Sequence, residues 1–410
     1  EGAQGVAVNT PIAMLLEDGE SEVSDAPAAA APADIPCVPN ATPASSDVLS
    51  TSAAPQPAGK AIANRDILYA QNVVMEPPPF DEAPFLEKTE PMQVREALRM
   101  AMSEEMRRDE KVFLLGEEVA EYQGAYKVTQ GLLQEFGARR VIDTPITEHG
   151  FAGLGVGAAM MGLKPVVEFM TWNFAMQAID QIINSAAKTL YMSGGQIKCP
   201  IVFRGPNGAA SRVAAQHSQC YASWYAHCPG LKVVAPYDAA DAKGLLNAAL
   251  EDPNPYLYFE HKMLYRSISG PVPDSYYTVE VGKAALAATG TQASIITYGM
   301  GVHWATKAVE ELGISADILD LRTILPWDKE AVAATVKKTG KVIFLQEDTL
   351  TGGIGAEICA WISEHCFADL DAPVMREGSL DTPVPFAPNL EKQFLPVDRF
   401  KLKLQELIAF

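Results

Sequence analysis

The stretch Pro145-Ile146-Thr147-Glu148-His149-Gly150 runs without a break into the small-residue segment 151–159, FAGLGVGAA. Val141 and Ile142 before it form an apolar pair that is typical of a short buried strand, and the small residues after it are typical of a closely packed helix. Glu148 is therefore expected at a strand-to-helix turn. In open α/β sheets, ligands bind at such turns.

A carboxylate at this position has two explanations. An acid near a helix N-terminus is favoured by the helix dipole by less than ~1 kcal/mol and needs no further role. The alternative is a ligand site, and it is favoured because other polar and aromatic groups also follow predicted strands. These groups are Glu117-Glu118, the block 169–174 (FMTWNF) and the segment 216–219 (QHSQ). In a parallel sheet they would meet at one edge.

The rest of the chain alternates between strand and helix patterns. This alternation predicts the α/β class, with two three-layer α/β/α domains built on mostly parallel sheets. The first domain is expected at 92–275 and the second at 281–410, with a crossover linker at about 267–279. Strands are expected at 112–115, 165–169, 201–203, 231–234, 256–259, 293–298, 316–321 and 342–345, and helices near 94–102 and from about Gly301, Asp328 and Ala356.

Length and charge limit the classes of function. A chain of 410 residues with 48% hydrophobic residues can form two domain-sized cores. The net charge of −19 argues against nucleic-acid binding, because neutralising phosphates requires clustered Lys and Arg, and it favours basic protein partners. No apolar run approaches the ~20 residues that a membrane-spanning helix needs.

The six cysteines show no CxxC pair and no small-domain spacing. Most lie in apolar strands or helices, so we expect reduced core residues in a reducing compartment. A metal site formed by Cys220, His217, His227 and Cys228 is disfavoured, because no four-ligand spacing is present. The cysteines are Cys37, Cys199, Cys220, Cys228, Cys359 and Cys366.

Six segments resemble, in order and spacing, the beta subunits of the thiamine-diphosphate-dependent 2-oxo acid dehydrogenases, most closely the pyruvate dehydrogenase type. The segments are 115–119, 124–128, 143–150, 177–181, 203–208 and 215–230. The resemblance extends from about Met92 to the C-terminus. It implies a thiamine-diphosphate pyrimidine-binding fold followed by a transketolase-like C-terminal domain. The implied activity is oxidative decarboxylation of pyruvate and reductive acetylation of lipoyl-lysine, which feeds acetyl-CoA formation.

The same resemblance implies roles for individual residues. Glu148 matches the glutamate that hydrogen-bonds the pyrimidine ring and promotes formation of the reactive carbanion, and His217 matches the histidine near the reacting carbon. Phe174, Met170 and Gln177 would line the pyrimidine, and Glu117 resembles a member of an acidic chain between paired sites. Without the resemblance, Phe174 and His217 would be interpreted as ordinary core or surface residues.

The resemblance also implies cofactors and partners. The chain lacks the Gly-Asp-Gly and Asn-Asn pattern by which such enzymes hold Mg²⁺ and the diphosphate, so an alpha subunit should hold that end of the cofactor. We expect two alpha and two beta subunits, bound to a dihydrolipoyl acyltransferase core, in a bacterial cytoplasm or, less favoured, a mitochondrial matrix. A K⁺ site is also implied, involving Ile201, Ala249, Leu250, Asp252 and Asn254.

The N-terminal region has a different composition. Residues 1–20 look like the last strands of a lipoyl domain, yet the only lysine before Lys88 is Lys60 and the lysine hairpin is absent. We expect a lipoyl-domain remnant that cannot be lipoylated. Residues 21–91 are rich in Ala, Pro, Ser and acids, which predicts a disordered, semi-stiff linker. Its role would be to keep a tethered lipoyl group near active sites, and the alternative is a tail without function.

Several other functions remain as alternatives. The nearest is the beta subunit of the branched-chain 2-oxo acid dehydrogenase, although 214–221 (AAQHSQCY) looks like the pyruvate type. An acetoin-cleaving relative is a weaker option. From a different class, the chain could be a non-catalytic scaffold subunit. A nicotinamide-binding dehydrogenase is disfavoured, because no Gly-x-Gly-x-x-Gly follows a strand with an acid at the right distance.

Overall fold

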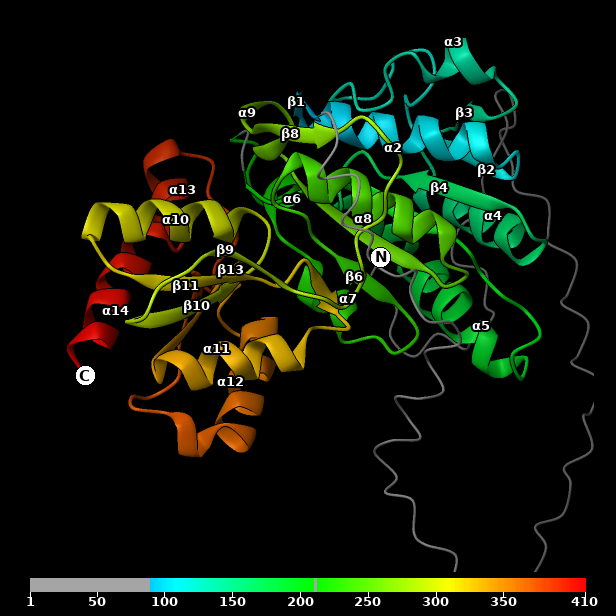
Figure 1. Cartoon of the computed structure of the whole chain (residues 1–410). Coiled ribbons are helices and arrows are strands. Elements are labelled where there is room, and N and C mark those ends of the chain that lie inside the picture. Colours follow the sequence, from blue (N-terminus) through cyan, green and yellow to red (C-terminus); the bar gives the residue numbers. More distant parts are fainter. Residues whose placement is uncertain (1–88, 210–211) are drawn as a thin grey trace, which may run out of the picture. The chain divides into compact units, whose positions relative to one another are not determined.

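The computed structural model of the protein describes residues 89–209 and 212–410. The lipoyl-domain remnant expected at 1–20 and the linker expected from 21 lie outside the described residues up to residue 88. Residues 89–91, expected in the linker, belong to strand β1 (Thr89–Gln93). All described residues fall in one compact unit, Ile62–Phe410. It contains two large sheets, each with helices packed on both faces (Figure 1).

The first large sheet has seven strands in the order β12-β6-β7-β5-β4-β2-β3. Neighbouring strands are parallel except at the edge, where β12 runs antiparallel to β6. The expected strands of this domain are all present, with shifted ends. Their bounds are β2 (Val112–Gly116), β3 (Val141–Asp143), β4 (Lys164–Glu168), β5 (Val202–Asn207), β6 (Lys232–Val234), β7 (Tyr256–His261) and β12 (Thr323–Leu325).

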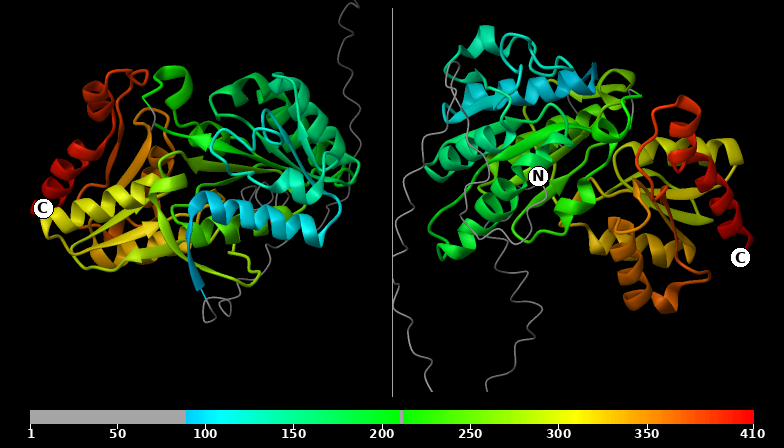
Figure 2. Two further views of the ribbon diagram at one scale, coloured as in Figure 1. Left: turned by 90° about the horizontal axis from the view of Figure 1, so that it is seen from above. Right: turned by 180° about the vertical axis from the view of Figure 1, so that it is seen from behind.

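Alternate residues of these strands pack against different helices. Val112 and Leu114 belong to the core cluster that contains the apolar residues of α2 and α8, whereas Phe113 and Leu115 belong to the cluster that contains those of α4. Helices α2 and α8 lie side by side on one face (Figure 1), and the left view of Figure 2 shows α2, in cyan, along that face. The helices of this domain are α2 (Val94–Arg108), α3 (Leu132–Phe136), α4 (Glu148–Met160), η2 (Phe174–Ala178), η3 (Gln181–Ala186), α5 (Ala187–Met192), α6 (Ala215–Ser218), α7 (Ala222–Ala226), α8 (Ala239–Glu251) and α9 (Leu264–Ser267).

The second large sheet has five strands in the order β14-β13-β10-β11-β9. Helices α10 and α14 cover one of its faces, and α11 and α12 cover the other. Both expected three-layer α/β/α domains are therefore confirmed. The elements are β9 (Ala285–Ala288), β10 (Ala293–Thr297), α10 (Met300–Leu312), β11 (Ala316–Asp320), α11 (Lys329–Thr339), β13 (Val342–Thr349), α12 (Ile354–His365), η4 (Phe367–Asp369), β14 (Met375–Ser379), α13 (Pro388–Phe394) and α14 (Val397–Ala409).

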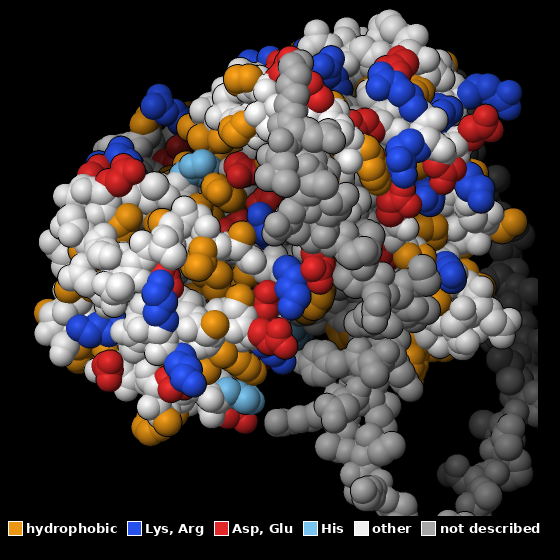
Figure 3. All heavy atoms as spheres, viewed as in Figure 1, with side chains coloured by type: hydrophobic (Ala, Val, Ile, Leu, Met, Phe, Trp, Pro, Cys, Tyr) orange, Lys and Arg blue, Asp and Glu red, His pale blue; other side chains and the backbone are white. Residues whose placement is uncertain are grey.

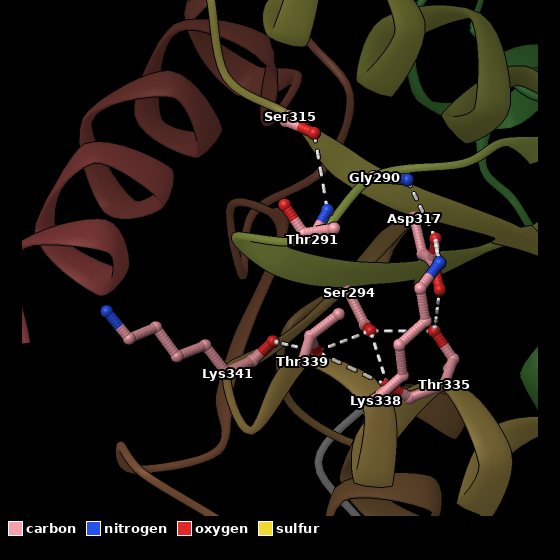
Figure 4. Close-up of polar contacts among 9 residues, drawn as sticks. All are labelled: Gly290, Thr291, Ser294, Ser315, Asp317, Thr335, Lys338, Thr339 and Lys341. Atoms are coloured by element: carbon pink, nitrogen blue, oxygen red, sulfur yellow. Dashed lines mark hydrogen bonds and ion pairs between the residues drawn. The ribbon is translucent and has the colours of Figure 1, made fainter.

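A polar network fixes α11 on this sheet (Figure 4). The Ser294 hydroxyl on β10 lies 2.7 Å from the hydroxyls of both Thr335 and Thr339 on α11. The Thr335 hydroxyl donates a 2.9 Å hydrogen bond to Asp317 on β11, and Lys338 forms an ion pair with the same carboxylate. Because these buried groups satisfy one another, they hold the helix in place without the cost of unpaired polar atoms.

The structure differs from the expected linker between the domains. Residues 267–279 contain strand β8 (Ser269–Pro273), which pairs antiparallel with β1 at the start of the described chain. The prediction of a simple crossover linker is therefore wrong for this part. Further on, β12 leaves the second domain and joins the first sheet, with Thr323 opposite Val234. Neither pairing follows from local sequence, because each joins segments far apart in the chain.

One apolar core extends through both domains. The cluster on the α4 side of the first sheet includes Tyr225 of α7, and the same cluster contains Tyr298 and Phe344 of the second domain. The outer surface is charged, with acidic and basic side chains interspersed on the face drawn in Figure 3. Among the described helices, none combines the length and the apolar character that a membrane span requires.

Candidate active site

The carboxyl ends of β2, β3 and β4 lie level with one another. Gly116 is opposite both Asp143 on β3 and Glu168 on β4. A Cβ atom at Gly116 would lie 2.4 Å from the Glu168 carbonyl oxygen, so only glycine allows the strands to approach this closely. The residues that follow the three strands, Glu117 and Phe169 among them, therefore start from one edge of the sheet.

The turn after β2 is tied to the turn after β3. The Asp143 carboxylate accepts hydrogen bonds from the backbone N–H groups of Ala120, at 2.7 Å, and Glu121, at 3.1 Å. The Thr144 N–H donates to the Gly116 carbonyl oxygen at 3.0 Å. These bonds bring the segment that carries Glu117 next to the segment that leads into Glu148.

Glu148 is the first residue of α4 and its side chain is buried, with 3% of its surface exposed. Glu117 is also buried, and its Oε1 atom has no hydrogen-bond partner within the described part of the chain. Burial, followed by the nearby negative charge of Glu148, raises the pKa of Glu117 to about 7. Two neighbouring carboxyl groups, one of which titrates near neutral pH, form an arrangement that can hold or pass a proton.

Phe174 and His217 come together from two different segments. Phe174 begins η2 after β4, and His217 lies on α6 after β5. Their ring centroids are 5.1 Å apart in an edge-on arrangement. The Asn173 side chain donates to the Ala215 carbonyl oxygen at 3.3 Å, which joins the two segments. The structure thus brings together two of the side chains singled out from the sequence.

The remaining candidates of this group lie on the same stretch of chain as Phe174. Helix α4, which begins at Glu148, packs directly against η2, which begins at Phe174. Met170 lies half-buried between β4 and η2, and Gln177 lies on η2 with an exposed side chain. His217 is also exposed. The candidate site therefore combines two buried carboxylates after β2 and β3 with an aromatic ring and an exposed imidazole after β4 and β5.

The residues suggested for K⁺ lie elsewhere. Ile201, Ala249, Leu250, Asp252 and Asn254 are all buried, near the amino ends of β5 and β7. This is the edge of the sheet opposite to Glu148. The Asp252 carboxylate already has three partners, Lys232, Asn254 and Tyr256. A cation here would depend on backbone carbonyl groups, and its role would be structural.

A cavity of about 330 Å³ opens beside this loop. Asn254 and Cys199 contribute to its wall, and the two prolines that flank Asn254 do so as well. None of the candidate catalytic residues lines this cavity, so the cavity does not belong to the candidate active site. Over residues 89–209 and 212–410, no three His, Cys, Asp or Glu side chains are grouped so that they could hold a metal ion.

The cysteines behave as the sequence predicts wherever the structure describes them. Cys199, Cys220, Cys359 and Cys366 are buried and free, and Cys228 is free and half-buried. Burial raises the pKa of the Cys199 and Cys359 thiols to about 12, so both are unreactive at neutral pH. Cys37 lies outside the described residues.

Sequence reasoning missed an ionic cluster beside the site. Arg204 on β5 is completely buried, and its guanidinium pairs with Glu168 on β4 and with Glu260 on β7. Its Nε atom donates to Glu260 at 2.6 Å, and the Tyr265 hydroxyl donates to the same carboxylate at 2.6 Å. The available signal was a charged residue in each of three apolar strands, because charged side chains in such positions are rarely buried without partners.

Comparison with known families and proteins agrees with this geometry. The family model described as transketolase, pyrimidine binding domain, matches residues 90–267, and the model described as transketolase, C-terminal domain, matches residues 282–399. A solved structure described as "Split gene transketolase, inactive beta4 tetramer" has the same fold, with a TM-score of 0.63 at 21% identity. The matched region covers 78% of this chain and 98% of the chain in that structure.

Closer relatives are found among bacterial and mitochondrial proteins. A Rhizobium meliloti protein described as pyruvate dehydrogenase E1 component subunit beta is 54% identical over 400 residues, which cover 96% of this chain and 83% of the relative. Proteins of the same description from Rickettsia felis and from mitochondria of Arabidopsis thaliana are 56% and 55% identical. They cover 74% of this chain, and 94% and 86% of their own lengths. The chain therefore belongs to the family of pyruvate dehydrogenase E1 component beta subunits.

Proposed function

We propose that this chain is the beta subunit of a pyruvate dehydrogenase decarboxylating component. With an alpha subunit it would carry out the thiamine-diphosphate-dependent oxidative decarboxylation of pyruvate and acetylate lipoyl-lysine, which feeds acetyl-CoA formation. One observation carries this proposal. Glu148 is buried beside Glu117, and the helix that begins at Glu148 packs against the helix that begins at Phe174. The relatives described above are named for pyruvate, which favours this substrate over a branched-chain 2-oxo acid.

The described residues fit one end of the cofactor. Glu117 has a buried oxygen without a partner, Glu148 is buried next to it, and the Phe174 ring is half-buried nearby. This set suits a flat heteroaromatic ring with polar nitrogens. We infer that the pyrimidine end would lie against this chain. The diphosphate end and Mg²⁺ would lie against an alpha subunit, as the family resemblance implies.

When bound, thiamine diphosphate supplies the carbon nucleophile that cleaves 2-oxo acids. Glu148 would hold a proton at a pyrimidine nitrogen, and its fixed place at the start of α4 would orient that bond. Phe174 and Met170 would pack against the ring and exclude water. His217 is exposed, so its imidazole can reach the incoming substrate and move a proton during acyl transfer.

An alpha subunit is expected to cover the apolar surface around α4 and α5. Five large apolar side chains are exposed on or next to these two helices, and exposed apolar side chains that gather on a surface are typical of a protein interface. They are Ile146 (80% exposed), Leu154 (58%), Met161 (85%), Tyr191 (71%) and Met192 (78%). Because Glu148 begins α4, a partner on this surface would also close the candidate site. The expected assembly has two alpha and two beta subunits.

The purified chain alone should not bind thiamine diphosphate and Mg²⁺ measurably, and binding should appear when the alpha subunit is added. Titration calorimetry should give one cofactor for each alpha-beta pair. Leu154→Lys should weaken assembly at least tenfold, because it places a charge in the interface, as sedimentation velocity would measure. Leu402→Lys on α14, where the leucine is 68% exposed, is the matched control. Tight cofactor binding by the chain alone would contradict this proposal.

A structural K⁺ ion at the amino edge of the first sheet is a second, separate proposal. At a concentration ten times its dissociation constant, a bound ion stabilises the folded state by about 1.4 kcal/mol. The free energy of unfolding should therefore be higher in KCl than in NaCl at equal ionic strength. Chemical denaturation in the two salts measures the difference. Equal stability in both would remove the K⁺ site.

Two further expectations stay predictions. The net charge of −19 suits a basic docking surface on a dihydrolipoyl acyltransferase core. The relatives include bacterial proteins and a mitochondrial one, so both a bacterial cytoplasm and a mitochondrial matrix remain as compartments.

A further inference from the structure

Lys262 connects the end of β7 to the segment that carries His217. It directly follows β7, and only 6% of its surface is exposed. Its Nζ atom donates a hydrogen bond to the backbone carbonyl oxygen of His217. Its backbone N–H donates to the Asn207 carbonyl oxygen at 3.1 Å. The lysine is therefore held at the end of the sheet and supports the His217 backbone from inside the protein.

The charged groups that face this lysine come from the second domain. Glu347 on β13 and Glu391 on α13 both act on its charge, while burial lowers the pKa of Lys262 to about 8. Other titratable groups near it are His261, its neighbour on β7, and His217 itself. The ammonium group is thus surrounded by protein, and its two acidic neighbours keep it charged at neutral pH.

Glu347 contacts both Ala209, which follows β5, and His261, the residue before Lys262. Its Oε1 accepts a 2.6 Å hydrogen bond from the Ala209 N–H, and its Oε2 lies 2.6 Å from Nε2 of His261. The His261 Nδ1 accepts a hydrogen bond from the Met263 N–H at 3.2 Å, which fixes the ring beside Glu347. At Gly208, where φ is +80°, a Cβ would lie within 2.6 Å of both side chains. Ala209, which follows β5, and His217 on α6 are therefore each held by a side chain from another element.

We propose that Lys262 is a positioning residue for His217, and that Glu347 of the second domain supports Lys262 through its contact with His261, the residue before it. This inference rests on the proposed function, which gives His217 a part in acyl transfer. The second domain then does more than complete the fold, because it supports the lysine that holds the His217 backbone. A purely structural Lys262 would instead only balance the charges of Glu347 and Glu391.

The test is Lys262→Met in the assembled alpha-beta complex. Methionine keeps the apolar part of the side chain and removes the ammonium group. Because burial already disfavours the charged form of Lys262, its removal should cost less stability than the loss of Arg204, and the complex should stay assembled. The kcat for acetylation of a lipoyl domain should fall about 10- to 100-fold, less than the roughly 10²–10⁴-fold that a general acid or base itself contributes, because the imidazole is misplaced and not removed. The KM for pyruvate should change less than twofold.

The pH profile separates a positioning role from a structural one. In the wild type, lipoyl acetylation should fall as the pH rises through about 8, where Lys262 loses its proton. This fall should be absent in Lys262→Met. In Glu347→Gln it should move to lower pH, because one of the acids that favour the charged lysine is gone. Lys307→Met, which removes an exposed lysine paired with Glu311 on α10, should match the wild type.

The possible outcomes distinguish a failure of the proposed function from a failure of this inference. A wild-type complex that does not decarboxylate pyruvate, measured with an artificial electron acceptor, overturns the proposed function and this inference with it. An active wild type whose Lys262→Met variant acetylates lipoyl domains at full rate, with the same pH profile, overturns this inference alone. A lower Tm with equal losses of decarboxylation and acetylation assigns Lys262 a structural role and also overturns it.

Discussion

Glu148→Gln is expected to lower pyruvate decarboxylation by the assembled complex by about 10²–10⁴-fold, the usual contribution of a general acid or base. Glutamine keeps the shape and most hydrogen bonds of glutamate, but it cannot hold or release the proton. Because the side chain is buried at the start of α4 and belongs to no ion pair among the described residues, the fold should tolerate the change. A coupled assay of carbon dioxide release measures the rate, and sedimentation velocity checks assembly.

The matched control is Glu110→Gln. It makes the same chemical change at an exposed residue before β2, at the opposite end of that strand, and it should keep the wild-type rate. If Glu148→Gln kept full activity in an intact complex, the chain would be a scaffold subunit whose α/β domains only support assembly. The same experiment therefore separates the catalytic proposal from its main alternative of a different class.

Arg204→Met should have the largest effect on stability. It removes the cation that is buried between Glu168 and Glu260, and breaking a buried ion pair by removing one partner costs about 3–5 kcal/mol. Urea denaturation of the full chain measures the loss. Arg107→Met is the control, because Arg107 forms an exposed pair with Glu135, and such pairs contribute about 1 kcal/mol or less.

The pH dependence of this loss has a definite sign. Burial already raises the pKa of Glu168 above its usual value, and losing Arg204 should raise it further. A carboxyl group whose pKa is higher in the folded than in the unfolded protein destabilises the fold as the pH rises above the unfolded value. The deficit of Arg204→Met should therefore be smaller at low pH and grow toward neutral pH. A deficit that is constant with pH would show that lost packing, not unpaired charge, is its cause.

Local patterns in the sequence were sufficient for much of the fold. The apolar pair before Thr144 and the small residues after Glu148 predicted a strand, a turn and a helix, which are now β3 and α4. Asp328 was expected to begin a helix, and its side chain caps α11 by accepting the Ala331 N–H at 3.0 Å. Such signals can be read from sequence because hydrophobic periodicity and capping act over only a few residues.

Local sequence patterns predicted only part of the candidate site. That Glu117, Glu148, Phe174 and His217 all follow strands was visible from pattern, while their roles depended on the family resemblance and stay predictions. The edge-on contact of Phe174 with His217, and the raised pKa of Glu117, required the three-dimensional arrangement. The suggested K⁺ residues gave no sign in the sequence that they lie at the opposite edge of the sheet from Glu148.

By itself the sequence determined the α/β class, the order of most strands and helices, and the turn at which Glu148 lies. Only the tertiary structure decided that β12 crosses to the first sheet, that Arg204 is buried between two acids, and that Glu347 holds the N–H of Ala209. The last two residues are 138 positions apart in the chain. Contacts of this kind depend on how two domains pack on one shared core, because no periodicity or turn chemistry reaches across such a separation.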